Sequence, residues 1–319
     1  MKKKVLVCGG TGFIGRNIVE SLTRRSDVEV FATHYRSKPL NIPGVKMVCA
    51  NLTNAEEVNK TVSGMDIIIQ AAAVTSGAKE GVLKPHLHVT DNAVMNSLIY
   101  RAAHENGVKH VVFFSCSVMY KSNTEPLKET DFDANEEIFS TYFGVGWTKV
   151  YLEKMCEFYS SLGKTKYTVL RHSNIYGPYD KFDLERSHVF GATMTKVMLA
   201  ENGGKISVWG SGEEARDLLY VSDLVDFVEL SIDKQSSKFE LYNLGCGVAI
   251  PVIDLVKKII LHTGKQVEIV HDLSKPTIKT SLCLDSSRAK AALGWLPRIS
   301  LDEGIRKTME WYKLNIKKS

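Results

Sequence analysis

Short apolar runs alternate with helical patterns along residues 1–171. The runs are "KVLVCG" (4–9), "VEVFAT" (28–33), "VKMVC" (45–49), "DIIIQAA" (66–72), "HVVFFSC" (110–116) and "YTVLRH" (167–172). Because a strand that is apolar throughout must be buried on both faces, the pattern predicts a parallel sheet covered by helices. The helices are expected near 13–25, 54–62, 86–106 and 141–161. This alternation is typical of an α/β protein with a Rossmann-type, doubly wound parallel sheet.

The pattern changes after residue 172, where longer polar stretches separate the apolar segments. A smaller α/β lobe is expected there, with a helix near 188–201, a strand at 205–210 and a helix near 250–262. Residues 216–232 return to a strand followed by a helix, and Ser222 is the expected N-cap. The predicted dinucleotide-binding domain therefore comprises 1–172 and about 217–245, and the predicted substrate-binding lobe comprises about 173–216 and 246–319.

The stretch "VCGGTGFIG" follows the first strand and opens the first helix. Gly10, Gly12 and Gly15 match G-x-G-x-x-G, and Gly9 extends the pattern toward the strand. Glycines let the turn tighten and let the backbone approach a pyrophosphate, which then meets free N–H groups at the helix N-terminus. At the first strand of a β-α-β unit, this pattern predicts a dinucleotide site rather than a simple chain turn.

The end of the second strand indicates which dinucleotide binds. NAD sites usually carry a carboxylate there, which binds the ribose 2′-OH. This chain has Thr33 and His34 at that position, followed by Arg36 and Lys38. A guanidinium suits a 2′-phosphate. NADP is therefore the expected cofactor, with NAD as the alternative.

Composition excludes several other classes of protein. The 319 residues are 44% hydrophobic and 24% charged, which describes an ordinary globular protein. The formal net charge of +5 gathers in Lys2–Lys4 and at the end of the chain without interleaved aromatics, so no nucleic-acid partner is expected. The apolar run after the first lysines is too short for a signal peptide, and the sequence holds no long apolar stretch typical of a membrane span.

The six cysteines form no C-x-x-C pair and no zinc-like spacing. We therefore expect no metal site and reduced, largely buried thiols. Such thiols fit a reducing, cytoplasmic location.

Together the motifs resemble those of the extended short-chain dehydrogenase/reductase superfamily, the NAD-dependent epimerase/dehydratase family. They are "GGTGFIG" (9–15), "QAAA" (70–73), Asn92, "FFSCSVMY" (113–120), the helix that carries Lys149, "SNIYGP" (173–178), "VWGSGEEARDLLYVSDL" (208–224) and "NLGCG" (243–247). The resemblance covers almost the whole chain. It implies a nucleoside-diphosphate sugar as substrate and a homodimer built from the helices near 86–106 and 141–161. Within the family, "YGPYDKF", "SHV" (187–189) and "VWGSG" are most similar to the GDP-fucose synthases.

The resemblance also implies which residues contact the ligands. Cofactor contacts are expected from Gly9, Thr11, Gly12, Phe13, Ile14, Gly15, Thr33, Arg36, Asn51, Leu52, Ala71, Ala72, Ala73, Lys149, Ser173 and Asn174. Substrate contacts are expected from Asn174, His188, Lys196 and Arg216, with Arg216 on the diphosphate or the nucleotide.

The catalytic motifs depart from the family pattern at two positions. The family's Ser/Thr position falls on Cys116, with Ser117 as the alternative if the register slips by one residue. Of the Tyr-x-x-x-Lys motif only Lys149 remains, because Val145 stands at the tyrosine position. In the family the lysine holds the nicotinamide ribose and the tyrosine is the acid/base. Lys149 is therefore expected to keep its cofactor, while proton transfer, worth about 10²- to 10⁴-fold in rate, needs another group.

Three side chains are candidates for the missing acid. Tyr142 precedes Lys149 by seven residues, about 10 Å along a helix, and is expected mainly to pack. Cys116 ends a buried strand at the edge where ligands bind, although it could equally be a small core residue. His188 occupies the position that GDP-fucose synthases use as an acid in epimerisation, but Val118 replaces their partner cysteine. We expect Cys116 or His188 to be the acid.

The leading hypothesis is hydride transfer at a sugar carbon by a 4-keto reductase or epimerase that acts on a nucleotide sugar, with GDP as the expected nucleotide. A nucleotide-sugar 4-epimerase or dehydratase with a different acid/base is the alternative. The dehydratase is disfavoured because Ser117 and Val118 stand where that mechanism needs an Asp-Glu pair. A catalytically silent dinucleotide-binding regulator is the remaining alternative, and Val145 alone supports it.

Overall fold

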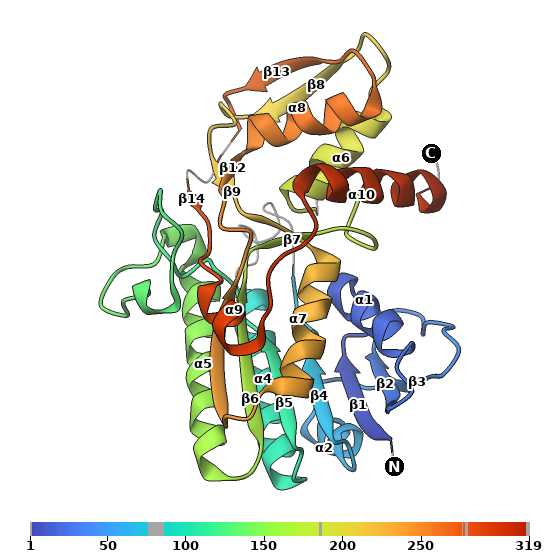
Figure 1. Cartoon of the computed structure of the whole chain (residues 1–319), viewed down its shortest axis with the longest axis vertical. Helices are drawn as coiled ribbons and strands as arrows, with labels where there is room; N and C mark the ends of the chain where they lie inside the picture. The colour runs from blue at the N-terminus through green and yellow to red at the C-terminus, as the bar shows by residue number, and fades with distance from the viewer. Residues whose placement is uncertain (1, 76–85, 185–186, 276, 278–279, 317–319) are drawn as a thin grey trace.

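A seven-stranded parallel sheet forms the larger part of the computed structural model, which describes the chain except residues 1, 76–85, 185–186, 276, 278–279 and 317–319 (Figure 1). The strand order is β11-β6-β5-β4-β1-β2-β3. The strands are β1 (Lys3–Cys8), β2 (Val28–His34), β3 (Val45–Cys49), β4 (Ile67–Gln70), β5 (His110–Phe114), β6 (Lys166–His172) and β11 (Phe239–Leu244). The first six lie where the apolar runs predicted strands. β11 was not predicted, since the polar residues Glu240 and Asn243 interrupt its apolar pattern.

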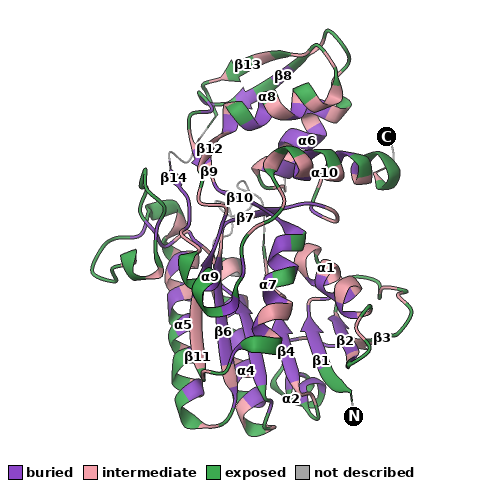
Figure 2. Cartoon of the chain, in the orientation of Figure 1, coloured by how far each residue is buried: buried purple, intermediate pink, exposed green. Residues whose placement is uncertain are grey.

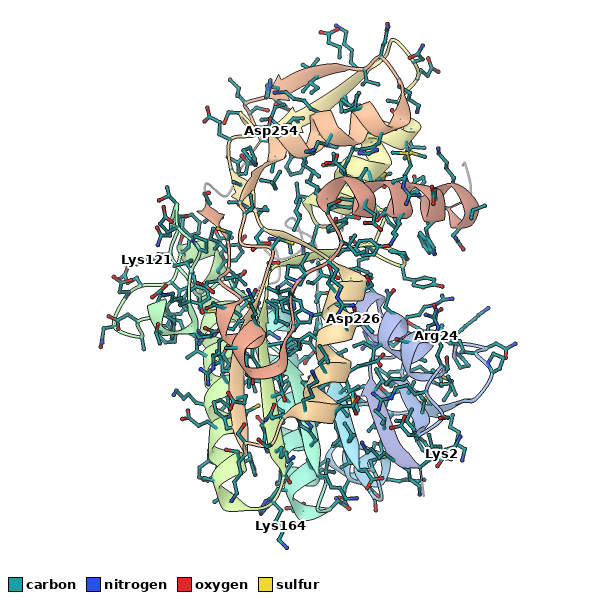
Figure 3. The ribbon with its side chains drawn as sticks, in the orientation of Figure 1. Lys2, Arg24, Lys121, Lys164, Asp226 and Asp254 are labelled. Carbon is teal, nitrogen blue, oxygen red and sulfur yellow. The ribbon has the colours of Figure 1, made fainter. Side chains whose placement is uncertain are left out.

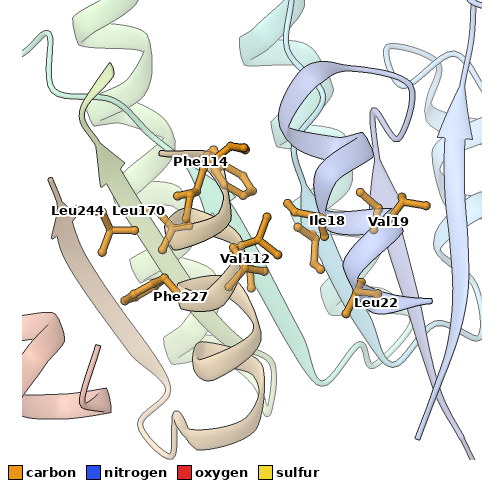
Figure 4. Packing of buried hydrophobic residues seen from close by; sticks show 14 of the residues in the cluster. Ile18, Val19, Leu22, Val112, Phe114, Leu170, Phe227 and Leu244 are labelled. Carbon is orange, nitrogen blue, oxygen red and sulfur yellow. The ribbon is translucent and has the colours of Figure 1, made fainter. Parts of the chain in front are cut away.

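Helices cover both faces of this sheet. One face carries α1 (Phe13–Leu22), α7 (Val221–Lys234) and α9 (Ser287–Leu293), and the other carries α2 (Ala55–Val62), α4 (His86–Glu105) and α5 (Phe143–Leu162). Ile18 and Leu22 of α1 and Phe227 of α7 pack over the sheet residues Val112 and Leu170 (Figure 4). The central strands β4 and β5 are buried throughout (Figure 2), whereas the edge strands β3 and β11 are only partly buried. The parallel sheet between two layers of helices confirms the predicted fold class.

Smaller elements form the remainder of the molecule, at the carboxyl end of the large sheet (Figure 1). The helices are α6 (Val189–Leu199), α8 (Val252–Thr263) and α10 (Leu301–Asn315), and the strands are β7 (Asn174–Tyr176), β8 (Lys205–Trp209), β9 (Ala215–Arg216), β10 (Leu218–Tyr220), β12 (Ile250–Pro251), β13 (Glu268–Asp272) and β14 (Ser281–Leu282). They enclose a core of their own around Tyr176, Phe190 and Met194. Trp295, just after α9, packs instead into the core beneath the large sheet. The division of the chain into two lobes at the stated boundaries stays a prediction.

The expected N-cap of the helix near 222–232 is wrong. α7 begins at Val221 and Tyr220 is its N-cap residue, so Ser222 lies exposed within the first turn. The shift arises because β10 runs directly into the helix without a polar connection.

Charged side chains such as Lys2, Lys121 and Lys164 are exposed and point away from the body of the molecule (Figure 3). All six cysteines are unpaired. Across the described residues, no helix has both the length and the apolarity needed to cross a membrane.

Candidate active site

The glycine-rich turn, residues 9–15, joins β1 to α1 and depends on close backbone contacts. Gly9 has φ of 73°, in the left-handed region that glycine tolerates best. A Cβ atom on Gly15 would lie 2.2 Å from the Gly9 carbonyl oxygen, and one on Gly10 would lie 2.6 Å from the Ala32 Cβ. The sequence therefore folds into a turn whose backbone lies open at the N-terminus of α1, a geometry that fits a bound pyrophosphate.

A cavity of about 500 Å³ extends from this turn along the ends of β2, β3 and β4. The predicted cofactor residues that line it are Gly9, Thr11, Gly12, Thr33, Arg36, Asn51, Leu52, Ala71, Ala72 and Ala73. The lining residues that were not predicted are His34, Tyr35, Ser37, Ala50, Thr53, Val74, Asp91 and Met95. Asp91 and Met95 come from α4, and Asn92 beside them was the only sequence signal for that part of the wall.

Other predicted cofactor residues do not line this cavity. Phe13 and Ile14 pack against the core from the first turn of α1, and Gly15 is buried in the turn. Lys149, Ser173 and Asn174 lie farther along the carboxyl edge of the sheet, beside β5, β6 and β7.

The end of β2 carries no acid. Thr33 is buried, and its Oγ1 accepts a hydrogen bond of 2.8 Å from the Gly9 N–H, so this hydroxyl supports the glycine turn. Arg36 is exposed, and its guanidinium lies 5.6 Å from the centre of the Tyr35 ring. Thr33 therefore stabilises the glycine turn, and Arg36, just beyond the end of β2, is a cation that lines the cavity.

Lys149 reaches from α5 to the end of β5. Its Nζ donates a hydrogen bond of 2.6 Å to the Phe114 carbonyl and lies 4.8 Å from the centre of the Phe113 ring. Burial lowers the pKa of Lys149. Cys116 lies two residues beyond Phe114, is partly buried, and is near enough for the two charges to interact. Burial raises the pKa of the Cys116 thiol, and the Lys149 ammonium works against that rise.

Tyr142 ends the short 3₁₀ helix Ser140–Tyr142 and immediately precedes α5. Burial raises its pKa, Arg216 lowers it and Cys116 raises it, so the phenol lies close to both groups. Tyr142 was expected mainly to pack. The ring does pack, against the hydrophobic cluster that includes Met119, Tyr120 and Ile138. The phenol is also near enough to Cys116 for the two groups to interact.

Two histidines complete the group. His172 ends β6, and burial lowers its pKa to about 4, with contributions from Lys149 and His188. His188 is the N-cap residue of α6, and desolvation together with Lys181 lowers its pKa. We refer to Cys116, Tyr142, Lys149, His172 and His188 as the catalytic cluster because they are the candidates for acid/base chemistry at this edge. His172 was missed from the sequence, where its only signal was its place at a strand end.

A buried polar network lies behind the catalytic cluster. Arg171 on β6 forms an ion pair of 2.6 Å with Glu153 on α5, and both side chains are almost fully buried. The Ser115 hydroxyl donates to Glu153, and Arg171 donates to the Tyr120 hydroxyl at 2.8 Å. The network ties α5 to β5 and β6, so it fixes the elements that present Lys149 and Cys116. No sequence motif indicated it.

The predicted substrate residues are distributed differently. Arg216 lies near Tyr142, and its guanidinium donates to the Ala215 carbonyl at 2.8 Å. The Asn174 amide donates to the Asp217 carbonyl at 3.3 Å. Lys196 lies on α6, where its ammonium donates to the Ser207 carbonyl at 2.8 Å.

Two further predicted residues are largely buried. Ser117 is buried just beyond Cys116, and Ser173 is buried at the junction of β6 and β7.

The chain is similar to several known proteins. A model of the NAD dependent epimerase/dehydratase family matches residues 5–245. A GDP-L-fucose synthase from Sinorhizobium fredii is 30% identical, with 98% of this chain and 96% of that protein covered. A GDP-L-colitose synthase from Yersinia pseudotuberculosis is 27% identical, with 97% of each covered. The structure of a UDP-glucose 4-epimerase from Thermotoga maritima, solved with UDP-glucose, superimposes with a TM-score of 0.86 at 25% identity and covers 98% of this chain and 100% of that one.

Proposed function

The chain belongs to the NAD dependent epimerase/dehydratase family, and we propose that it reduces or epimerises a nucleoside-diphosphate sugar by hydride transfer at a sugar carbon. The family resemblance seen in the motifs is thereby confirmed, as is the class of NAD(P)-dependent enzymes acting on nucleotide sugars. We propose a GDP-linked 4-keto sugar as the substrate. The likeness to a GDP-L-fucose synthase and a GDP-L-colitose synthase over almost the whole chain supports this choice.

The observation that carries the proposal is the closeness of Cys116 to Lys149 at the carboxyl edge of the sheet. The Lys149 ammonium is bonded to the Phe114 carbonyl, two residues before Cys116, and is near enough to act on the thiol. When bound, the dinucleotide supplies the hydride. Cys116 would give its thiol proton to the oxygen of the sugar carbonyl as that oxygen gains negative charge, and the resulting thiolate would be stabilised by the Lys149 ammonium. Solvent then returns the proton to sulfur. In this scheme Lys149 acts on a thiol as the family lysine acts on the tyrosine.

His188 is the second candidate for the acid, because it lies on the lobe side of the catalytic cluster and near His172. Tyr142 is the third, and its closeness to Cys116 and Arg216 gives it a stronger case than its sequence position did. Arg216 would then hold the diphosphate, since a guanidinium binds phosphate oxygens in pairs.

We propose NADP as the cofactor, with NAD as the alternative. The open glycine turn fits the pyrophosphate, and Arg36 with no acid at the end of β2 favours a 2′-phosphate. Six unpaired cysteines support a reducing, cytoplasmic location.

A homodimer through α4 and α5 is the proposed assembly. These helices lie side by side on one face of the sheet, and Ser97 of α4 contacts Met155 of α5. Tyr151 and Phe158 of α5 are 53% and 58% exposed although both are large and apolar, and they are two turns apart on one stripe. A Tyr151→Arg, Phe158→Arg variant should sediment as a 35.6 kDa monomer. A parent protein that is itself monomeric at micromolar concentration contradicts the proposal.

The function is tested by thermal shift with GDP-, UDP-, dTDP- and CDP-sugars in the presence of NADPH. A ligand that binds the folded chain raises its melting temperature by mass action, so GDP-sugars should give the largest shift. Stabilisation by UDP- or dTDP-sugars alone would show that the nucleotide is wrongly assigned. A chain that binds NADPH but none of the sugars would be the silent regulator instead.

A further inference from the structure

His172 presents one ring nitrogen in a fixed state. Its Nδ1 lies 2.7 Å from the Ser173 carbonyl oxygen. Because a carbonyl can only accept, Nδ1 carries the proton and Nε2 is left with a lone pair. Phe114 meets the ring edge-on, with ring centres 6.2 Å apart, and limits its rotation. Within the described part of the chain, no group forms a hydrogen bond with Nε2.

The surroundings keep this imidazole neutral. Lys149 and His188 both lie near enough to oppose a positive charge on the ring, and burial acts in the same direction. The neutral ring with its Nδ1 proton engaged is therefore an acceptor at Nε2. Lys149 and Arg216 can only donate hydrogen bonds, so Nε2 supplies a hydrogen-bond acceptor that these cations cannot provide.

The position of His172 indicates which ligand it meets. Lys149 approaches from α5, on the expected cofactor side, and His188 approaches from α6, on the lobe side. Since both groups act on the His172 ring, His172 lies where the nicotinamide and the sugar ring would meet. Sugar hydroxyls donate hydrogen bonds as well as accept them. A sugar ring that is surrounded by cationic side chains therefore needs an acceptor for its hydroxyl protons.

We propose that His172 is a specificity-determining residue whose Nε2 accepts a hydrogen bond from a hydroxyl of the sugar ring. The inference rests on the proposed function, because it needs a nucleotide sugar in the site. A buried acceptor that has lost its donor is left unpaired, so His172 selects for sugars that carry this hydroxyl. No proton is transferred to His172 in this role.

Two substitutions distinguish the role of Nδ1 from the role of Nε2. In His172→Asn, the side-chain amide can still donate to the Ser173 carbonyl, but nothing reaches the position of Nε2. In His172→Gln, the longer side chain can place its carbonyl oxygen near that position. Calorimetric titrations with GDP-mannose, and with GDP as the sugar-free control, are done in the presence of NADP⁺.

We expect the parent protein to bind GDP-mannose more tightly than GDP. His172→Asn should weaken GDP-mannose about tenfold and leave GDP unchanged, whereas His172→Gln should stay close to the parent. The affinity for NADP⁺ and the melting temperature without ligands should be unchanged in both variants.

Three results would overturn the inference alone, in a parent protein that favours GDP-mannose over GDP. The first is an unchanged GDP-mannose affinity in His172→Asn. The second is a loss of NADP⁺ affinity, which would assign Nε2 to the cofactor. The third is an equal loss of affinity for every ligand together with a lower melting temperature of the variant, which would show a structural role. A parent protein that binds GDP-mannose no better than GDP contradicts the proposed GDP-sugar function as well as the inference.

Discussion

The glycine turn and the catalytic cluster lie at the same edge of one sheet, yet they are assembled in opposite ways. The turn is made from consecutive residues, and the contact between Gly15 and the Gly9 carbonyl closes within it. The cluster draws its members from the segments after β5, before α5, within α5, at the end of β6 and before α6. A local motif can therefore be read from spacing, whereas the cluster exists only when those elements pack.

The two regions also differ in what maintains them. Backbone contacts shape the turn, and a single Cβ atom would disrupt it. The cluster is held from behind by the ion pair of Arg171 with Glu153, which binds α5 to β6. Substitutions in the two regions should thus separate cofactor binding, turnover and stability.

Replacing the proposed acid should reduce turnover and spare the cofactor. We expect Cys116→Ala to lower kcat by about 10²- to 10⁴-fold at unchanged NADPH affinity, because only proton transfer is removed. Lys149→Ala should weaken both NADPH binding and turnover. Steady-state rates and NADPH fluorescence titrations measure the two effects.

Tyr142→Phe is the matched control, since it removes only a hydroxyl and should cost little. Loss of turnover in Tyr142→Phe, while Cys116→Ala and His188→Ala stay active, would show that Tyr142 is the acid. Loss in His188→Ala alone would assign the acid to His188.

Breaking the network behind the cluster should destabilise the fold. Arg171→Met leaves Glu153 buried without its partner, and we expect the free energy of unfolding to fall by about 3–5 kcal/mol in urea titrations. The double variant Arg171→Met, Glu153→Leu removes both charges and should be more stable than the single variant. An Arg171→Met protein as stable as the parent would mean that the pair does not fix α5.

A substitution within the turn tests the first region. Gly15→Ala places a Cβ atom 2.2 Å from the Gly9 oxygen, and the strain should lower stability by about 1–3 kcal/mol and weaken NADPH binding. In Gly12→Ala the corresponding distance is 3.3 Å, so the fold should be nearly unchanged while the added methyl group obstructs the pyrophosphate. Equal melting temperatures for the two variants would contradict this account of the turn.

Arg36→Ala should have the smallest effect and act on selectivity. NADPH affinity should fall about tenfold because a charged contact to the 2′-phosphate is lost, while NADH affinity stays the same. Direct titrations with both cofactors measure the difference. Arg36 is misassigned if the parent protein binds NADPH and NADH equally well.

Much of the fold could be predicted from local patterns. The six apolar runs became strands, and the glycine spacing located the turn at β1. The central strands β4 and β5 are buried on both faces, as uniform apolarity predicts, whereas β3 lies at the edge and is only partly buried. β11 escaped prediction because Glu240 and Asn243 interrupt its apolar pattern, whereas the other edge strand, β3, has the more apolar run "VKMVC". Ser222 was misjudged because a polar residue near a helix start indicates a cap without fixing which residue begins the helix.

The doubly wound sheet and the family could be established from residue type and spacing along the chain. It is the packing of the elements that brings Cys116 and His172 close to Lys149, and Tyr142 close to Cys116. The physical reason is that parallel strands bring their carboxyl ends to one edge, so residues far apart in the chain become neighbours there. The charge and hydrogen-bonding state of each group then depends on burial and on those neighbours, which no stretch of sequence contains.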